Sequence, residues 1–379
     1  MWGIWSLVLL VLLLVISCEE PLYKVDAPNQ AGVSLQVRQV AVDQRAHRLY
    51  ASNTTMKAVD IYDISEAAAK FEKSIPLGVE PFGIVLAPDL GKLFTGNSDS
   101  TLAIIDVAPT SSRTDRLLAK VSTGGKTRAD LLTYDIRERK VYLANPDEGF
   151  VTSVDAIRNQ ALQRIDLAKG LRQPRYDPAD GMVYITDADS NLLFQVDPRR
   201  DALVQKWTVP GTCLPAGFAI DSKRQRALIG CTTPGMQLTL LWDLAHRRLL
   251  RRFPQVGQAE QVIYDPAVDR YLAAGSSGGS SALAVFTGDP VTFAGSVQTQ
   301  ADSRAVGYDE AHGRFYVPTA KPGEGGLIGG PLPTGEAQYP VSWVLIMLSV
   351  PLVLLGVIVF FYGRRRTREG AAGGSPIVT

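Results

Sequence analysis

The sequence predicts an all-β protein, a single seven-bladed β-propeller with an N-terminal signal peptide and one C-terminal transmembrane helix. Three observations predict it. A short phrase recurs seven times in the middle of the chain, two almost purely apolar blocks occupy its ends, and Gly and Pro are plentiful, at 34 and 23 of 379 residues. Many short strands joined by tight turns have this composition.

The N-terminal block, residues 1–17, is uncharged and ends at Val15-Ile16-Ser17-Cys18. At ~1.5 Å per residue it would span about 25 Å as a helix, which is short for a membrane span but suits a signal peptide. Its end resembles the bacterial lipobox, so we expect lipidation at Cys18. An ordinary cleaved signal or an uncleaved anchor remains open, because no Lys or Arg precedes the apolar run.

The repeated phrase is an Asp, a short polar turn, and a hydrophobic strand with an aromatic residue near its start. The second residue of that strand falls at positions 50, 94, 142, 184, 228, 272 and 316. In six of the seven copies the Asp lies seven residues earlier. Each period holds about four short strands, and four-stranded repeats of about 40–50 residues are propeller blades. We therefore predict seven blades within residues 19–320.

The last repeat ends in glycine-rich sequence, residues 323–330, and lacks an obvious outermost strand. Counting back from Asp43 by the spacing of the other blades reaches residues 25–28, next to the segment Leu22–Val25. Since a propeller must close its ring, we predict that this N-terminal segment supplies the missing strand of blade seven. Residues 321–340 are then a Gly/Pro linker.

The second apolar block, residues 341–362, would span about 33 Å as a helix, enough to cross a bilayer. Arg364, Arg365, Arg366 and Arg368 follow it. By the positive-inside rule, the tail of residues 363–379 is cytoplasmic and residues 19–340 are outside. A buried core helix is the alternative, which the arginine cluster disfavours. We therefore expect a single-pass protein of the cytoplasmic membrane, with a periplasmic or cell-surface propeller.

Before this helix, Leu332-Pro333-Thr334-Gly335 looks like a sortase signal that lacks its variable residue. We interpret it as part of the linker, with sortase processing as the minor alternative.

The charge balance bears on whether the protein binds nucleic acid, and the cysteines bear on whether it forms a disulfide. The chain has 39 Lys and Arg against 38 Asp and Glu, so it lacks the basic excess typical of nucleic-acid binding. Besides Cys18, the two cysteines are Cys213 and Cys231. A pair in an exported domain suggests a disulfide, and two separate buried thiols are the alternative.

Several repeats resemble those of the YVTN-type β-propeller family, over roughly residues 37–320. The similar phrases are Tyr50-Ala-Ser-Asn53, Tyr142-Leu-Ala-Asn145 and Tyr184-Ile-Thr-Asp187, together with Cys213-Leu-Pro-Ala-Gly217 and Gly230-Cys231. The resemblance implies an exported propeller and strengthens the Cys213–Cys231 bridge, which would staple the first two strands of blade five. It implies little about activity.

No catalytic motif, metal site or cofactor site is predicted. The three histidines, His47, His246 and His312, lie in or beside the predicted turns and are far apart in the repeat. Zinc, calcium and phosphate-loop motifs do not occur.

Charged residues recur at one position of the predicted innermost strands, five residues before the place of the repeating Asp. It is charged in five blades and holds Arg38, Phe82, Asp130, Arg172, Ala216, Glu260 and Arg304. Alternate residues of an innermost strand face the central channel, so this position predicts a ring near one channel mouth. The candidate ligand-binding residues are Arg38, Asp130, Arg172, Glu260 and Arg304. The ring suits an anion, or mutual salt bridges in a solvated rim.

The sequence thus favours a non-enzymatic binding or scaffolding module for an unknown protein or small-molecule ligand, held at the membrane. The alternative is a propeller hydrolase or lyase, lactonase-like, with its site in the central channel. Fold alone does not separate these functions, because propellers host both.

Overall fold

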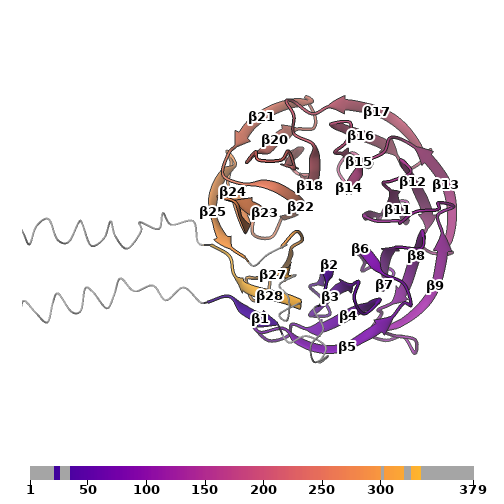
Figure 1. Cartoon of the computed structure of the whole chain (residues 1–379). Helices are drawn as coiled ribbons and strands as arrows, with labels where there is room; N and C mark the ends of the chain where they lie inside the picture. The colour runs from indigo at the N-terminus through magenta and orange to yellow at the C-terminus, as the bar shows by residue number, and fades with distance from the viewer. Residues whose placement is uncertain (1–20, 26–34, 300–302, 320–325, 334–379) are drawn as a thin grey trace, which may run out of the picture. The chain divides into compact units, whose positions relative to one another are not determined.

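A computed structural model describes residues 21–25, 35–299, 303–319 and 326–333. These residues form seven four-stranded antiparallel sheets, arranged around a central channel (Figure 1). The predicted all-β fold and the number of blades are therefore confirmed.

The first four blades follow the chain in order, each from the channel outward. Blade one comprises β2 (Val37–Asp43), β3 (Arg48–Asn53), β4 (Ala58–Asp63) and β5 (Lys70–Pro76). Blade two comprises β6 (Pro81–Ala87), β7 (Lys92–Asn97), β8 (Thr101–Asp106) and β9 (Arg116–Ser122). Blade three comprises β10 (Leu132–Asp135), β11 (Lys140–Asn145), β12 (Phe150–Asp155) and β13 (Gln160–Asp166). Blade four comprises β14 (Leu171–Asp177), β15 (Met182–Asp187), β16 (Leu192–Asp197) and β17 (Ala202–Thr208).

The remaining blades include the one that joins the two ends of the propeller. Blade five comprises β18 (Pro215–Asp221), β19 (Arg226–Cys231), β20 (Thr239–Asp243) and β21 (Arg248–Phe253). Blade six comprises β22 (Gly257–Asp265), β23 (Arg270–Ser277), β24 (Ser280–Thr287) and β25 (Thr292–Gln298). Blade seven comprises β26 (Gly307–Asp309), β27 (Arg314–Thr319), β28 (Gly326–Pro331) and β1 (Tyr23–Val25).

Burial along each blade explains the sequence pattern. The second strand is buried almost throughout, as in β3 and β11, because neighbouring blades cover both of its faces. This is where the repeated aromatic residues lie, among them Tyr50, Phe94 and Tyr142, all inaccessible to solvent. The outermost strand, as in β13, is mostly exposed and polar. The core is thus a set of apolar layers between blades.

The repeating Asp ends the innermost strand and shapes the turn that follows. The Oδ1 atom of Asp43 accepts hydrogen bonds from the backbone N–H groups of Arg45 and Ala46, both at 3.0 Å. Asp135 makes the same pair of bonds with Arg137 and Glu138. A short carboxylate that accepts local N–H groups stabilises this turn, which explains the fixed place of the Asp in the repeat.

Strand β1 closes the ring, as predicted. It pairs with β28, with Tyr23 opposite Gly329 and Val25 opposite Leu327, and the two lie side by side in Figure 1. The predicted boundary at residue 320 was wrong, because the glycine-rich segment expected to begin the linker contains β28. A Cβ atom on Gly329 would lie 2.5 Å from the Tyr23 ring. The glycines that resemble a linker thus let β1 approach closely.

The described residues include no helix able to cross a membrane. Both predicted apolar segments, residues 1–17 and 341–362, lie outside the described residues. So do Cys18, the tail that was predicted to be cytoplasmic, and most of the predicted linker.

Candidate functional site

The seven ring positions predicted from the repeat lie together around one cavity of about 410 Å³. Each blade contributes one of them: Arg38, Phe82, Asp130, Arg172, Ala216, Glu260 and Arg304. All five predicted candidates are therefore brought together at the channel. Arg128 also lines this cavity.

Irregular strand pairing explains how the ring residues face the channel. In five blades the pairing of the first and second strands shifts just where the ring residue lies, for example between Val37 and Val40 and between Leu171 and Pro174. The same shift occurs in β6, β18 and β22. A bulge re-aims side chains and ends regular pairing. In these five blades the ring residue therefore lies outside the regular pairing of its own sheet, and its side chain can face the channel.

Buried glutamines beside the ring hold neighbouring blades in place. Gln39 Oε1 accepts the backbone N–H of Ile84 in the next blade at 3.2 Å. In the same way Gln173 accepts that of Phe218 at 3.0 Å, and Gln261 that of Val306 at 2.7 Å. Since buried polar groups are costly when unpaired, these bonds fix the spacing of the innermost strands and so of the ring.

On the blade-six and blade-seven side, the ring charges pair with each other. Arg304 Nη1 lies 2.5 Å from Glu260 Oε1. The side chains are 54% and 41% exposed, and such solvated pairs contribute about 0–1 kcal/mol. One interpretation of the ring from the sequence was that its charges form salt bridges with each other, and Arg304 and Glu260 do so.

On the blade-three side, Asp130 faces a concentration of arginines. Arg128 Nε lies 3.5 Å from Asp130 Oδ2 and 3.7 Å from an oxygen of Asp147. Its guanidinium carbon is also 5.9 Å from the centre of the Phe82 ring. Arg128 was missed in the sequence because it precedes β10, outside the repeated register. An arginine two residues before a ring carboxylate was the signal that could have found it.

The pKa of Asp130 is raised above that of an ordinary aspartate. Burial is the main cause, because it disfavours the charged carboxylate. Arg128, Arg172 and Arg38 oppose the shift, and Asp147 adds to it. Asp130 therefore neutralises the arginines less completely as the pH falls.

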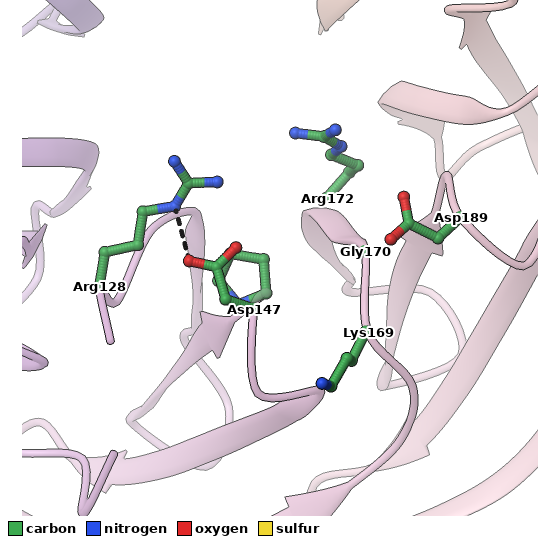
Figure 2. A pocket seen from close by; sticks show the side chains of 7 residues that line it. Arg128, Asp147, Lys169, Gly170, Arg172 and Asp189 are labelled. Carbon is green, nitrogen blue, oxygen red and sulfur yellow. Dashed lines mark ion pairs between the residues drawn. The ribbon is translucent and has the colours of Figure 1, made fainter. Parts of the chain in front are cut away.

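A second cavity, of about 250 Å³, shares Arg128 and Arg172 with the first. Figure 2 shows both arginine side chains reaching into open space, with Lys169 and the carboxylates of Asp147 and Asp189 around them. Only Arg128 is ion-paired in this view, with Asp147. Two adjoining hollows are thus bordered by the same two guanidinium groups.

Arg172 and Arg38 make no ion pair with any residue in the described ranges. The Nε atom of Arg172 is buried and has no hydrogen-bond partner among these residues. The larger cavity is bordered by four arginines and two carboxylates, which leaves two net positive charges. This arrangement can accept the oxygens of a carboxylate or phosphate, the groups that guanidinium binds best.

The predicted disulfide is present and lies close to the mouth. Cys213 and Cys231 are bonded and inaccessible to solvent. The bridge joins the end of β19 to the segment that leads into β18. The next residue, Thr232, donates its backbone N–H to the Cys213 carbonyl at 3.0 Å and lines the larger cavity. The disulfide therefore fixes the blade-five part of the mouth.

The histidines lie away from the ring. His246 and His312 each contact an Asp three residues earlier, in their own turns, at 2.9 and 2.7 Å. In the part of the chain that the structure describes, no three His, Cys, Asp or Glu side chains are grouped as metal ligands would be.

Comparisons with known proteins support the propeller fold and do not indicate a function. No protein-family model and no curated protein matches the sequence. Among solved structures, a Kuenenia stuttgartiensis hydrazine synthase chain aligns with a TM-score of 0.67 and 11% identity, covering 82% of this chain and 99% of that one. A chain of a mitotic checkpoint complex aligns with a TM-score of 0.63 and 13% identity, covering 83% and 99%. At such identities the likeness shows the propeller fold and nothing about function.

Proposed function

We propose that this chain is a binding protein of the YVTN-type propeller group, whose channel mouth takes up a small anion outside the cytoplasmic membrane. The observation that carries the proposal is the cationic cavity, to which all seven blades contribute a residue. Its volume lies within the range of about 300–1,000 Å³ typical of small-molecule sites.

The charge arrangement indicates the kind of ligand. Arg172 borders both hollows, with Arg38 on one side and Lys169 on the other. A molecule with two or more carboxylate or phosphate groups could place one group in each hollow. We therefore propose a multiply charged organic anion, for which citrate is a suitable probe.

The alternative, a lactonase-like hydrolase or a lyase, fits the mouth less well. A calcium-dependent site of this kind needs several oxygen ligands from carboxylates and amides. The ring supplies two carboxylates, Asp130 and Glu260, and each already lies beside an arginine. The ring chemistry therefore favours binding an anion.

Display at the membrane is the second part of the proposal. It rests on the sequence of residues 1–18 and 341–368. The first and last described strands, β1 and β28, are neighbours in blade seven, so a lipid at Cys18 and a helix after the linker would both tether this blade. Cys18→Ser should abolish incorporation of labelled palmitate, and unchanged labelling would contradict lipidation.

Calorimetric titration of the full-length chain in detergent tests the binding function, with citrate, succinate and inorganic phosphate as probes. Each guanidinium near a bound charge contributes about 1 to 4 kcal/mol, so Arg38→Ala/Arg172→Ala should weaken binding at least tenfold. The matched control is Glu260→Ala/Arg304→Ala, which alters the same rim without changing its net charge. We expect less than a threefold effect from it.

Three results would contradict the proposal. These are no binding of any probe at millimolar concentration, equal losses in the two double variants, or chemical conversion of a probe by the wild-type chain.

A further inference from the structure

A second cationic group lies further along β14 than Arg172. Arg175 stands two residues before Asp177 and pairs with Tyr184 of β15. The equivalent residues of the other blades pair in the same way with their second strands, and none is charged: Ala41, Val85, Thr133, Ala219, Ile263 and Gly307. Arg175 is therefore the one charge among these seven equivalent positions.

The Arg175 side chain reaches from blade four to two other blades. Its Nε donates to the carbonyl of Phe218 in β18 at 3.0 Å, and its Nη2 to the carbonyl of Val262 in β22 at 3.2 Å. A longer contact of 3.5 Å joins Nη1 to the carbonyl of Pro174. The strands β14, β18 and β22 are the innermost strands of their blades (Figure 1). The hydrogen bonds from Arg175 to carbonyls of β18 and β22 therefore place its guanidinium on the channel side of these strands.

No carboxylate of the described residues pairs with this guanidinium. Protein atoms surround the Arg175 guanidinium, and the residue keeps partial exposure to solvent, as a group that faces the channel should. Burial lowers the pKa of Arg175 to about 10, which leaves it a cation at neutral pH. A charge in such surroundings is costly unless an opposite charge compensates it.

The guanidinium still has hydrogen-bonding capacity. It carries five N–H groups, of which three take part in the contacts above. The three carbonyl oxygens supply only partial negative charge. A small anion in the channel would complete both the hydrogen bonding and the charge balance.

We propose that Arg175 binds a small monovalent inorganic anion, of the chloride class, inside the central channel. This site is separate from the organic-anion site at the mouth and does not depend on it. The equivalent positions of the other blades are mostly apolar, so a divalent anion such as sulfate would lose more hydration on entry. The bound anion would stabilise the junction of blades four, five and six.

Thermal unfolding of the full-length chain in detergent tests the proposal, with chloride replaced by gluconate at constant ionic strength. A ligand that binds only the folded state raises the Tm as its concentration exceeds Kd. We expect a rise of roughly 2–4 °C between 1 and 100 mM chloride. Arg175→Met should lose this dependence, and Arg38→Ala/Arg172→Ala should keep it.

A second measurement needs no variant, which matters if Arg175→Met fails to fold. The wild-type chain should broaden the ³⁵Cl resonance of chloride, and excess bromide should reverse the broadening while citrate should not. Absence of broadening, reversal by citrate, or a chloride dependence that is retained in Arg175→Met would overturn the channel site. Loss of that dependence in Arg38→Ala/Arg172→Ala would assign the anion to the mouth and overturn it as well.

Discussion

Strand β1 offers the sharpest test of how the ring closes. Val25 is 5% exposed and belongs to an apolar cluster shared by blades one and seven, which includes Val37, Leu49 and Tyr316. Tyr23 packs on this cluster and donates its hydroxyl to the Ala67 carbonyl in blade one at 2.9 Å. The strand therefore joins the last blade to the first.

The size of the effect follows from the buried groups. Val25→Ala removes two buried methyl groups. At about 0.8 kcal/mol each plus the cost of the cavity left behind, the free energy of unfolding should fall by about 2 kcal/mol. For a domain of this size the Tm should fall by about 3 °C. Tyr23→Ala should cost more, because the hydrogen bond is lost as well.

Urea unfolding of the full-length chain, followed by circular dichroism, measures these losses. Lys24→Ala is the matched control, since Lys24 lies between the two residues and is exposed. Its side chain makes a contact of its own, and because exposed contacts of this kind contribute about 0–1 kcal/mol, its loss should cost less than about 1 kcal/mol. If Val25→Ala and Tyr23→Ala unfold at the same urea concentration as Lys24→Ala, β1 does not close the ring.

Three further predictions concern the disulfide, the blade contacts and the mouth. Cys213→Ala/Cys231→Ala opens a closed loop with a sequence separation of 18 and should lower the free energy of unfolding by about 3 kcal/mol; an unchanged urea midpoint would refute this. Asp201→Asn should cost about 2 kcal/mol, because Asp201 holds Lys140 at 2.7 Å and Tyr142 at 2.5 Å; Asp166→Asn, in an exposed pair with Arg164, should cost under 1 kcal/mol. Burial raises the pKa of Asp130, so its negative charge is lost as the pH falls through that raised value and opposes anion binding above it. Since citrate itself takes up protons as the pH falls, the comparison is made at neutral pH, where Asp130→Asn should bind citrate more tightly than the wild type; an equal or weaker affinity would contradict this.

The repeat made much of the fold predictable. A blade is a local unit, so the spacing of the Asp and the aromatic residues fixed the blade count and the ring positions that meet at the mouth. The closing strand followed from the same count. The Cys213–Cys231 bridge was predictable from the expected export and from the family resemblance, and both cysteines belong to blade five.

Contacts between residues far apart in the sequence, or outside the repeat, were not predictable in this way. Strand β28 was mistaken for a linker because Gly329 is selected by the approach of Tyr23, which lies at the other end of the sequence. Arg128 lies outside the repeated register, and Arg175 occupies a position that is uncharged in every other blade. The partners of Arg175 lie in blades five and six and become visible only when the blades are assembled around the channel.

Hydrogen exchange of the full-length chain, with and without a saturating amount of the tightest-binding probe, tests the binding site most directly. Exchange should slow in the backbone around Arg38, Arg128 and Arg172 and should remain unchanged in the outermost strands β5, β9 and β13. Protection confined to outer strands, or none at all under saturating conditions, would contradict a ligand site at the channel mouth.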